Sequence, residues 1–363
     1  MRVLVTGSSG FLGKHLVSDL LDANYEVTAF DLRHCDWPHK DALAKGRLVL
    51  CQGDITSEAD CVKAVAGCQA VIHSASPSHH APTAVLQLVN VQGTRLLLQA
   101  AKADKGCRAF VYTSSSSVIF SGDDTLNADE SWKILTTKDR HGVLDGYSAS
   151  KAEAEIEVIA ADCAELRTTA IRPAALFGPE DTVMFPRLIA QCKSGRFKYM
   201  IGDGTNLFDW TYVKNVTHSL MLALAKITSS SKADVDAVAG EAFHITNDEP
   251  QPFWAQPIAL ATGLGYPAPT TKLPVWLIAT VMEVLAVIFA LINPLYTTLT
   301  GKPPLAPPLA SHEVRYMGIN RTYNITKAKT VLGYEPQYTM RQGWDATIEW
   351  ATKQGHHAKD QQR

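Results

Sequence analysis

The segment "RVLVTGSSGFLGKHL" near the start of the chain constrains the fold more than any other stretch. Residues 2–6 form a run of aliphatic and β-branched side chains, and a helical pattern begins at residue 11. Between them, Gly7, Gly10 and Gly13 follow the spacing G-x-x-G-x-x-G. The first glycine suits a tight turn, the second lets a pyrophosphate approach the backbone, and the third lets the helix pack on the strand. The segment therefore predicts a strand, loop and helix that bind the pyrophosphate of a dinucleotide.

Further strand-like runs alternate with helical patterns as far as about residue 180. They are "YEVTAFD", "RLVLCQGD", "QAVIHSAS", "RAFVYTSSS" and "RTTAIRP". This alternation is typical of a parallel sheet that has helices on both faces. We therefore expect an α/β fold, with a doubly wound, Rossmann-type sheet over residues 1–185 and elements that return to it from about residues 205–245.

The last third of the chain is expected to form a smaller, partly helical substrate lobe over residues 246–350, followed by a polar tail at 354–363. Within this lobe, residues 275–292 are apolar except for Thr280 and Glu283. The run has about 18 residues, close to the minimum that crosses a bilayer. Two interpretations stay open: a buried helix of the lobe, or a helix that is embedded in a membrane or covers the substrate.

Charge and cysteine content exclude several classes of function. The chain has 34 basic and 36 acidic residues, a formal net charge of -2, and no run of Lys and Arg. Binding to nucleic acid is therefore not expected. The seven cysteines are scattered without CxxC spacing, which indicates a reducing compartment and no metal site. The chain begins directly with a strand pattern, so a secreted protein is not expected either.

Residues at the ends of the next strands extend the nucleotide pocket. Asp31 ends the second run, where a carboxylate can bind both ribose hydroxyls and repel a 2′-phosphate. This favours NAD, while the neighbouring Arg33 keeps NADP as an alternative. Asp54 follows the third run and is placed to reach the adenine. The other predicted cofactor contacts are Phe11, Leu12, Ile55, Ala75 and Ser76.

A second set of residues predicts chemistry beside this pocket. The fifth run ends in "VYTSSSSV", which places hydroxyls at the carboxyl edge of a parallel sheet, where ligands gather. In "GYSASKAEAE", Tyr147 and Lys151 share one face if the segment is helical. A nearby cation can turn a tyrosine into a usable proton acceptor. A solvated Tyr and Lys pair is the alternative, and the glycine loop in the same chain argues against it.

These motifs, in this order, resemble those of the extended short-chain dehydrogenases/reductases. The resemblance rests on the glycine loop, Asp31, Asp54, the serine-rich strand end, Tyr147-x-x-x-Lys151 and "RPAALFGPED". Within that family, further segments resemble the 3β-hydroxysteroid dehydrogenase branch. They are "HSASPS", "VNVQGT", "VYTSSSSVIFSG", "NADESW", "GDGTNLFDWTYVKNV", "ITNDEPQPFW" and "YNITKAKTVLGYEP". The resemblance extends to about residue 350.

The resemblance implies a role for each matching residue. Tyr147 would be the general base, and Lys151 would hold the nicotinamide ribose and stabilise the phenolate. Ser115 would bind the substrate oxygen, with Ser114 as the alternative because four consecutive serines leave the register open. Pro173 would line the nicotinamide pocket.

The resemblance is strongest to the decarboxylating fungal members of the branch. It implies NAD(P)-dependent oxidation of a 3β-hydroxyl group on a sterol-type 4α-carboxylate to the 3-ketone, with loss of CO2. The alternatives are a 3β-hydroxysteroid dehydrogenase/isomerase and a triterpenoid or meroterpenoid 3-hydroxy dehydrogenase that does not decarboxylate. The expected location is the cytosolic face of the endoplasmic reticulum membrane, with the cytoplasm as the alternative. The expected assembly is a homodimer or a complex with other sterol-demethylation enzymes.

Overall fold

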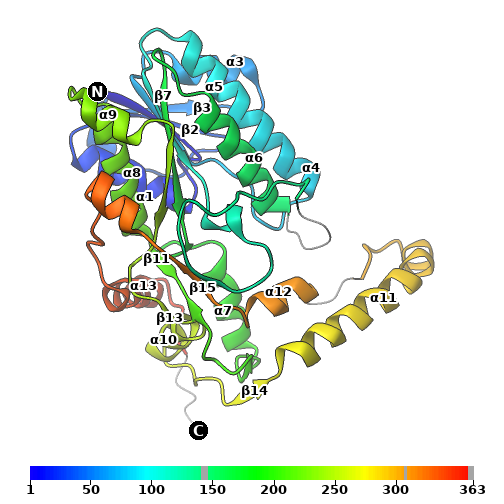
Figure 1. Cartoon of the computed structure of the whole chain (residues 1–363). Coiled ribbons are helices and arrows are strands. Elements are labelled where there is room, and N and C mark those ends of the chain that lie inside the picture. Colours follow the sequence, from blue (N-terminus) through cyan, green and yellow to red (C-terminus); the bar gives the residue numbers. More distant parts are fainter. Residues whose placement is uncertain (140–145, 306–308, 359–363) are drawn as a thin grey trace.

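Seven parallel strands form the main sheet of the computed structural model, which describes residues 1–139, 146–305 and 309–358 (Figure 1). Their order across the sheet is β12-β7-β5-β4-β1-β2-β3. The strands are β1 (Arg2–Thr6), β2 (Glu26–Asp31), β3 (Leu48–Gln52), β4 (Ala70–His73), β5 (Ala109–Thr113), β7 (Arg167–Pro173) and β12 (Glu241–Ile245). The strand order reverses between β1 and β4, which is where open α/β sheets bind ligands. The predicted doubly wound fold is confirmed.

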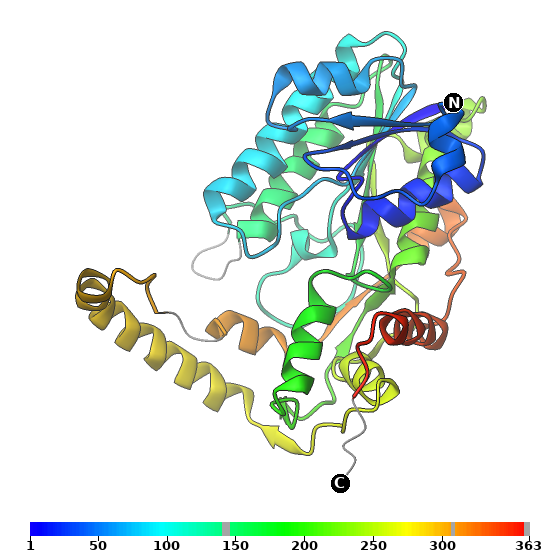
Figure 2. The same ribbon diagram turned by 180° about the vertical axis from the view of Figure 1, so that it is seen from behind.

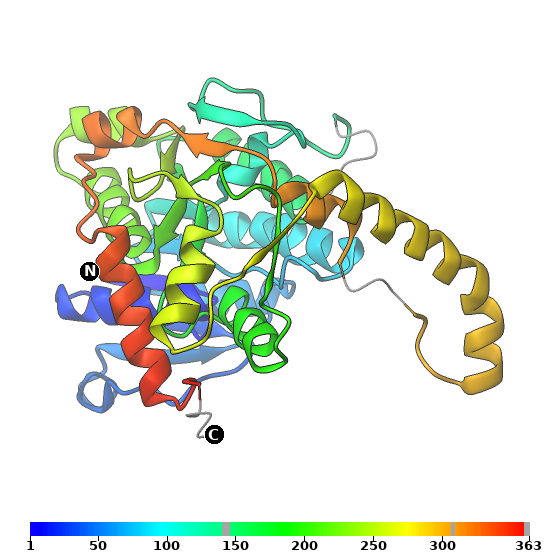
Figure 3. The ribbon, with the colours of Figure 1, turned by 90° about the horizontal axis from the view of Figure 1, so that it is seen from below.

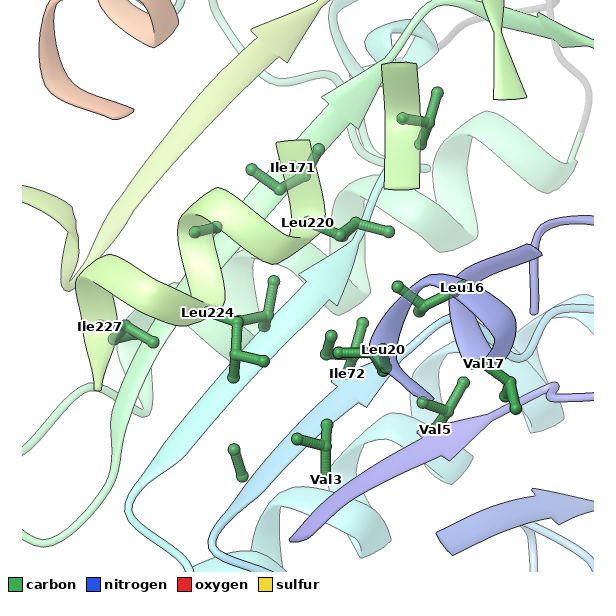
Figure 4. Packing of buried hydrophobic residues seen from close by; sticks show 14 of the residues in the cluster. Val3, Val5, Leu16, Val17, Leu20, Ile72, Ile171, Leu220, Leu224 and Ile227 are labelled. Atoms are coloured by element: carbon green, nitrogen blue, oxygen red, sulfur yellow. The ribbon is translucent and has the colours of Figure 1, made fainter. Parts of the chain in front are cut away.

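Helices cover both faces of this sheet (Figures 1 and 2). One face carries α1 (Phe11–Asp22) and α8 (Val213–Ile227), and the other carries α3 (Glu58–Val65), α5 (Thr94–Ala103) and α6 (Gly146–Ala160). Leu16 and Leu20 of α1 pack with Val3 and Val5 of β1, and all four are fully buried (Figure 4). Each such side chain contributes about 1.5–3 kcal/mol through burial. This packing holds α1 against β1 and so fixes the glycine loop between them.

A smaller sheet lies beside the main one, in the order β13-β10-β15-β6. It contains β6 (Thr125–Ala128), β10 (Leu207–Phe208), β13 (Gln251–Pro252) and β15 (Arg321–Tyr323). Phe208, Trp210 and Phe253 form an aromatic core here, with ring centroids 4.8–5.6 Å apart. The smaller lobe also contains α7 (Met184–Lys193), α10 (Ala255–Gly263) and α13 (Met340–Lys353). Strand β6 comes from the first half of the chain and pairs with β15 from the second half. This pairing attaches the smaller sheet to the part of the chain that builds the main sheet.

Shorter elements connect these layers. They are α2 (Lys40–Ala44), α4 (Thr83–Leu86), η1 (Gln87–Gly93), η2 (Ser116–Ile119), β8 (Ala175–Phe177), β9 (Tyr199–Ile201), β11 (Trp210–Tyr212), α9 (Lys232–Val238), β14 (Thr271–Leu273), α12 (Ser311–Tyr316) and η3 (Ala328–Leu332). Of the expected polar tail, residues 354–358 follow α13 closely, and the amide of Ala358 donates to the carbonyl of Leu264. Residues 359–363 lie outside the described residues.

The apolar segment of the lobe forms helix α11 (Val275–Thr300), which leaves the body of the protein (Figures 1 and 3). Within this helix, Ala279 is the one buried residue. By length and composition the helix could cross a membrane. The interpretation as a buried helix of the lobe is therefore wrong. The sequence left this open because periodicity and composition do not show whether another layer of the protein covers a helix.

Candidate active site

The glycine loop closes tightly against the end of β4. Gly7 has φ +67°, and a Cβ there would lie 2.7 Å from the Cα of Ala75. A Cβ on Gly13 would lie 2.1 Å from the carbonyl oxygen of Gly7. Gly10 is less confined and precedes α1, whose start has no side-chain cap and no acidic residue in its first turn. The amide groups at this helix start are thus available to a pyrophosphate, as the sequence predicts.

Asp31 faces this loop from the end of β2. One carboxylate oxygen accepts from the amide of Ser9 at 3.0 Å, and the other accepts from the amide of Arg33 at 3.3 Å. The neighbouring Arg33 side chain is exposed. Asp31 therefore stands where an adenosine ribose would follow a pyrophosphate held at α1, which fits NAD.

The other predicted cofactor residues are less uniform. Asp54 accepts two hydrogen bonds from Thr56, through its amide and its hydroxyl, both at 2.8 Å, and Ile55 is buried beneath this turn. Phe11 and Leu12 are half-buried against the aromatic core of the smaller lobe. Their side chains are engaged in packing, so a contact with the cofactor would involve their backbone.

Three further predicted residues lie at the carboxyl edge of the main sheet. Ala75 and Ser76 follow β4, where the amide of Ala75 donates to the hydroxyl of Thr6 at 3.1 Å and Ser76 is exposed. Pro173 is buried at the end of β7, paired in register with Ile245 of β12. The positions predicted separately from the sequence thus share one edge of one sheet.

Helix α6 docks on the end of β5 and brings the predicted catalytic residues to the same edge. Tyr147 lies in the first turn of α6, half-buried, and Lys151 lies one turn later on the same face. The Lys151 ammonium is buried, donates to the carbonyl of Thr113 at 2.7 Å, and lies 4.8 Å from the centroid of the Tyr112 ring. Because Thr113 ends β5 and the serines follow it, this bond fixes Lys151 of α6 beside the start of the serine cluster.

The four serines after β5 differ in access. Ser114 is buried, and its hydroxyl has no hydrogen-bond partner among the residues that the structure describes. Ser115 is half-buried, and its hydroxyl lies 2.9 Å from the hydroxyl of Ser117, which is half-buried as well. The structure therefore favours Ser115 over Ser114 as the serine that a substrate can reach. The structure also places the hydroxyl of Ser117 beside that of Ser115. Four consecutive serines in the sequence gave no means of distinguishing Ser117 from its neighbours.

Charge in the centre of the site is unbalanced. Burial lowers the pKa of Lys151 to about 7, with Glu155 acting in the opposite direction. Glu155 is held by Arg172 in a buried ion pair, and Lys151 has no ion-pair partner among the described residues. Burial and the charge of Lys151 lower the pKa of His73 to about 3, and this neutral histidine lies between the hydroxyls of Thr6 and Thr94. A negative charge arriving beside Lys151 would therefore be stabilised strongly.

Two histidines that sequence reasoning missed lie beside Tyr147. The His79 ring meets the Tyr147 ring edge-on, with centroids 6.3 Å apart, and also lies against the ring of His80. His80 Nδ1 lies 3.7 Å from Oε1 of Glu313 in α12, and Arg187 of α7 lies 3.9 Å from the same oxygen. The sequence signal was only a pair of histidines after the fourth strand, whereas Glu313 is remote in the chain.

The strand order, the glycine loop and the Tyr147 and Lys151 pair at one sheet edge are those of an extended short-chain dehydrogenase/reductase. The model of the 3-beta hydroxysteroid dehydrogenase/isomerase family matches residues 4–275. The chain belongs to this family, as the motifs indicated.

Relatives and solved structures agree with this assignment. The chain is 38% identical to the sterol-4-alpha-carboxylate 3-dehydrogenase ERG26, decarboxylating, of Candida albicans, over 96% of this chain and 97% of that protein. It is 36% identical to the 3beta-hydroxysteroid-dehydrogenase/decarboxylase isoform 1 of Arabidopsis thaliana, over 95% and 78%. The dTDP-glucose 4,6-dehydratase DesIV of Streptomyces venezuelae, solved with NAD bound, superposes with a TM-score of 0.72 at 24% identity, over 97% of each chain. That structural likeness shows the shared fold.

Proposed function

We propose that this protein oxidises the 3β-hydroxyl group of a sterol-type 4α-carboxylate to the 3-ketone with NAD(P), and that CO2 is lost. The observation that carries the proposal is the similarity, over nearly the whole chain, to proteins named as decarboxylating 3-dehydrogenases. The active-site residues are compatible with this activity, because Tyr147, Lys151 and Ser115 serve proton transfer at a carbinol. The role in C4 demethylation of a sterol or related terpenoid follows from the same names.

The residues around the glycine loop fit NAD as the preferred cofactor. The close approaches at Gly7 and Gly13 leave no room for side chains, the start of α1 offers amides to the pyrophosphate, and Asp31 offers a carboxylate to the ribose. When bound, NAD supplies the acceptor for the hydride that leaves C3. The protein supplies the orientation and the movement of the proton.

Proton transfer falls to Tyr147. Its phenolate would accept the proton of the 3β-hydroxyl while the hydride leaves the same carbon. The buried Lys151 cation, which lacks an ion-pair partner among the described residues, would favour this phenolate and bind the nicotinamide ribose. Ser115 would donate a hydrogen bond to the substrate oxygen and so hold the hydroxyl against Tyr147.

Decarboxylation needs no further catalytic group. The 3-ketone of a 4α-carboxylate is a β-keto acid, so the bond from C4 to the carboxylate carbon breaks and its electron pair forms an enolate at C3 and C4. Ser115 and the now protonated Tyr147 would donate hydrogen bonds to the enolate oxygen. Protonation at C4 then gives the ketone, and one site serves both steps.

The activity is tested with purified protein, NAD and a 3β-hydroxy-4α-carboxysterol that carries an isotopic label in the carboxyl group. We expect NADH and labelled CO2 in equal amounts. NADH without labelled CO2 would contradict decarboxylation and favour a dehydrogenase of the isomerase or secondary-metabolite type. Absence of both products, with NAD binding intact, would contradict the substrate assignment.

Replacing Asp31 by Ala should shift cofactor preference from NAD toward NADP. The variant loses the charged hydrogen bonds to the ribose, which contribute about 1.5–3 kcal/mol, and also the repulsion of a 2′-phosphate. We expect the ratio of kcat/KM for NAD to that for NADP to fall by about 10–100-fold. Asp36→Ala, on the exposed part of the same loop, is the matched control and should leave the ratio unchanged. An unaltered ratio in Asp31→Ala would contradict the ribose contact.

The location proposed for the protein is the cytosolic face of the endoplasmic reticulum membrane. Two observations support association with a membrane: the exposed apolar helix α11 and the named sterol chemistry of the relatives. The expected homodimer, or complex with other sterol-demethylation enzymes, stays a prediction.

A further inference from the structure

Helix α11 carries a continuous apolar stripe that no other part of the described chain covers. The stripe residues follow one another at intervals of three and four, so they lie on one face of the helix. They are Leu277, Val281, Val284, Ile288, Leu291, Leu295 and Leu299, each between 40% and 76% exposed. An exposed apolar face of this length marks an interaction surface.

The remaining contacts of α11 are few. Leu285 and Phe289, to one side of the stripe, are half-buried. The side chain of Asn293 exchanges two hydrogen bonds with the backbone of Leu305, at 2.9 and 2.7 Å. Near the base of the helix, Arg315 of α12 pairs with Glu283 at 2.8 Å. These polar contacts lie off the stripe, which stays exposed along the helix.

Both ends of α11 are fixed to the same body, which excludes a single crossing of a bilayer. Just before the helix, β14 pairs with β9, and after it β15 pairs with β6 and β10. A helix that crossed the membrane would place these flanking strands on opposite sides. A hairpin that crossed and returned would leave residues 301–305, which are not helical, in hydrocarbon with unsatisfied backbone groups. An orientation in the plane of one leaflet avoids both problems.

The surface fits lipid better than a second copy of the chain. Beside the stripe, Trp276, Val287 and Ile292 are also exposed, so the apolar face is broader than the seam of a coiled coil. The sequence has no charged residue between Glu283 and Lys302, whereas a coiled-coil seam is flanked by charges that select the partner. Trp276 at the base is a typical residue of the membrane interface.

The histidines beside Tyr147 connect to this helix through α12. Glu313 of α12 contacts His80, and the neighbouring His79 faces the Tyr147 ring. On the same short helix, Arg315 holds Glu283 of α11. Hence α12 contacts the base of the apolar helix and also His80, whose neighbour His79 faces Tyr147.

We propose that α11 lies in the plane of one leaflet as a monotopic element, and that the substrate reaches Tyr147 directly from that leaflet, past α12. The proposal rests on the function proposed above, because only an apolar substrate with the solubility of a sterol resides in the leaflet. It adds the route: the substrate leaves the lipid without crossing water, and the His80 and Glu313 contact lies on that route.

The test compares two ways of presenting the same 3β-hydroxy-4α-carboxysterol, embedded in phosphatidylcholine vesicles or carried by cyclodextrin. Val287→Glu places a charge on the open face, while Val62→Glu, on the exposed surface of α3, is the matched control. We expect Val287→Glu to lose flotation with vesicles and at least about tenfold in kcat/KM for the vesicle substrate, because a charge in the apolar layer is costly. With cyclodextrin it should match the parent within about twofold. Val62→Glu should match the parent in both assays.

Three outcomes would overturn the proposal. Equal activity of Val287→Glu and the parent on vesicles contradicts delivery from the leaflet. Normal flotation of Val287→Glu together with dissociation of a dimer, seen by ultracentrifugation, assigns the stripe to a second copy. In sealed vesicles, modification of Lys302→Cys by a thiol reagent trapped inside shows that the helix crosses. If the parent protein does not turn over the substrate carried by cyclodextrin, the proposed function is wrong. Flotation with vesicles and the reaction of Lys302→Cys with the trapped reagent still test the placement of the helix in that case.

Discussion

Tyr147→Phe should lower turnover of the sterol acid by about 10²–10⁴-fold and leave NAD binding unchanged. The substitution removes the phenol oxygen that accepts the substrate proton, and it keeps the ring that packs at the start of α6 beside His79. The glycine loop and Asp31 are not altered, so the affinity for NAD should persist. Steady-state formation of NADH measures the first effect, and calorimetric titration with NAD measures the second.

A second tyrosine gives the matched control. Tyr199, in β9, is 43% exposed and remote from the glycine loop, so Tyr199→Phe should keep both turnover and NAD binding. Unchanged turnover in Tyr147→Phe would show that another group takes the proton. Loss of NAD binding in that variant would instead show that the pocket, and not the proton transfer, had been damaged.

The main sheet could be predicted because its signals are local. A buried parallel strand is a short apolar run. The glycine loop and the serine cluster each follow such a run directly, and Asp31 ends one. The order of the runs then places these residues at one edge of the sheet. The pairing of β6 with β15 has no comparable signal, because short strands far apart in the chain meet only after the lobes have formed.

The parts of the site that sequence reasoning missed depend on contacts across the lobes. Glu313 approaches His80 because α12 is placed by β15 and α11, and no spacing in the sequence encodes that approach. The choice between Ser114 and Ser115 depends on which hydroxyl is buried, which identical letters do not show. Likewise, the apolar run of α11 is compatible with a buried helix and with an exposed one. The two are distinguished only because no layer of the described structure covers the helix.

Replacing Lys151 by Met should stabilise the protein without nucleotide while it abolishes efficient turnover. The folded state lowers the pKa of Lys151 from 10.5 to about 7 because the ammonium is desolvated. Below about pH 7 both folded and unfolded chains hold the proton, so the full cost of burying the charge opposes folding. Between about pH 7 and 10.5 the unfolded chain binds this proton and the folded chain does not, so the free energy of unfolding of the parent rises with pH.

The expected difference follows from that sign. At about pH 6 the Met variant should have the larger free energy of unfolding, by about 2–4 kcal/mol after the loss of the hydrogen bond to Thr113, and the difference should shrink toward about pH 10. Denaturant unfolding of both proteins across this range measures it. Lys63→Met, at an exposed lysine of α3, should show no such trend. A constant difference across pH in Lys151→Met would mean that the buried ammonium is already compensated, and the stabilisation of a Tyr147 phenolate by an unbalanced cation would then lose its physical basis.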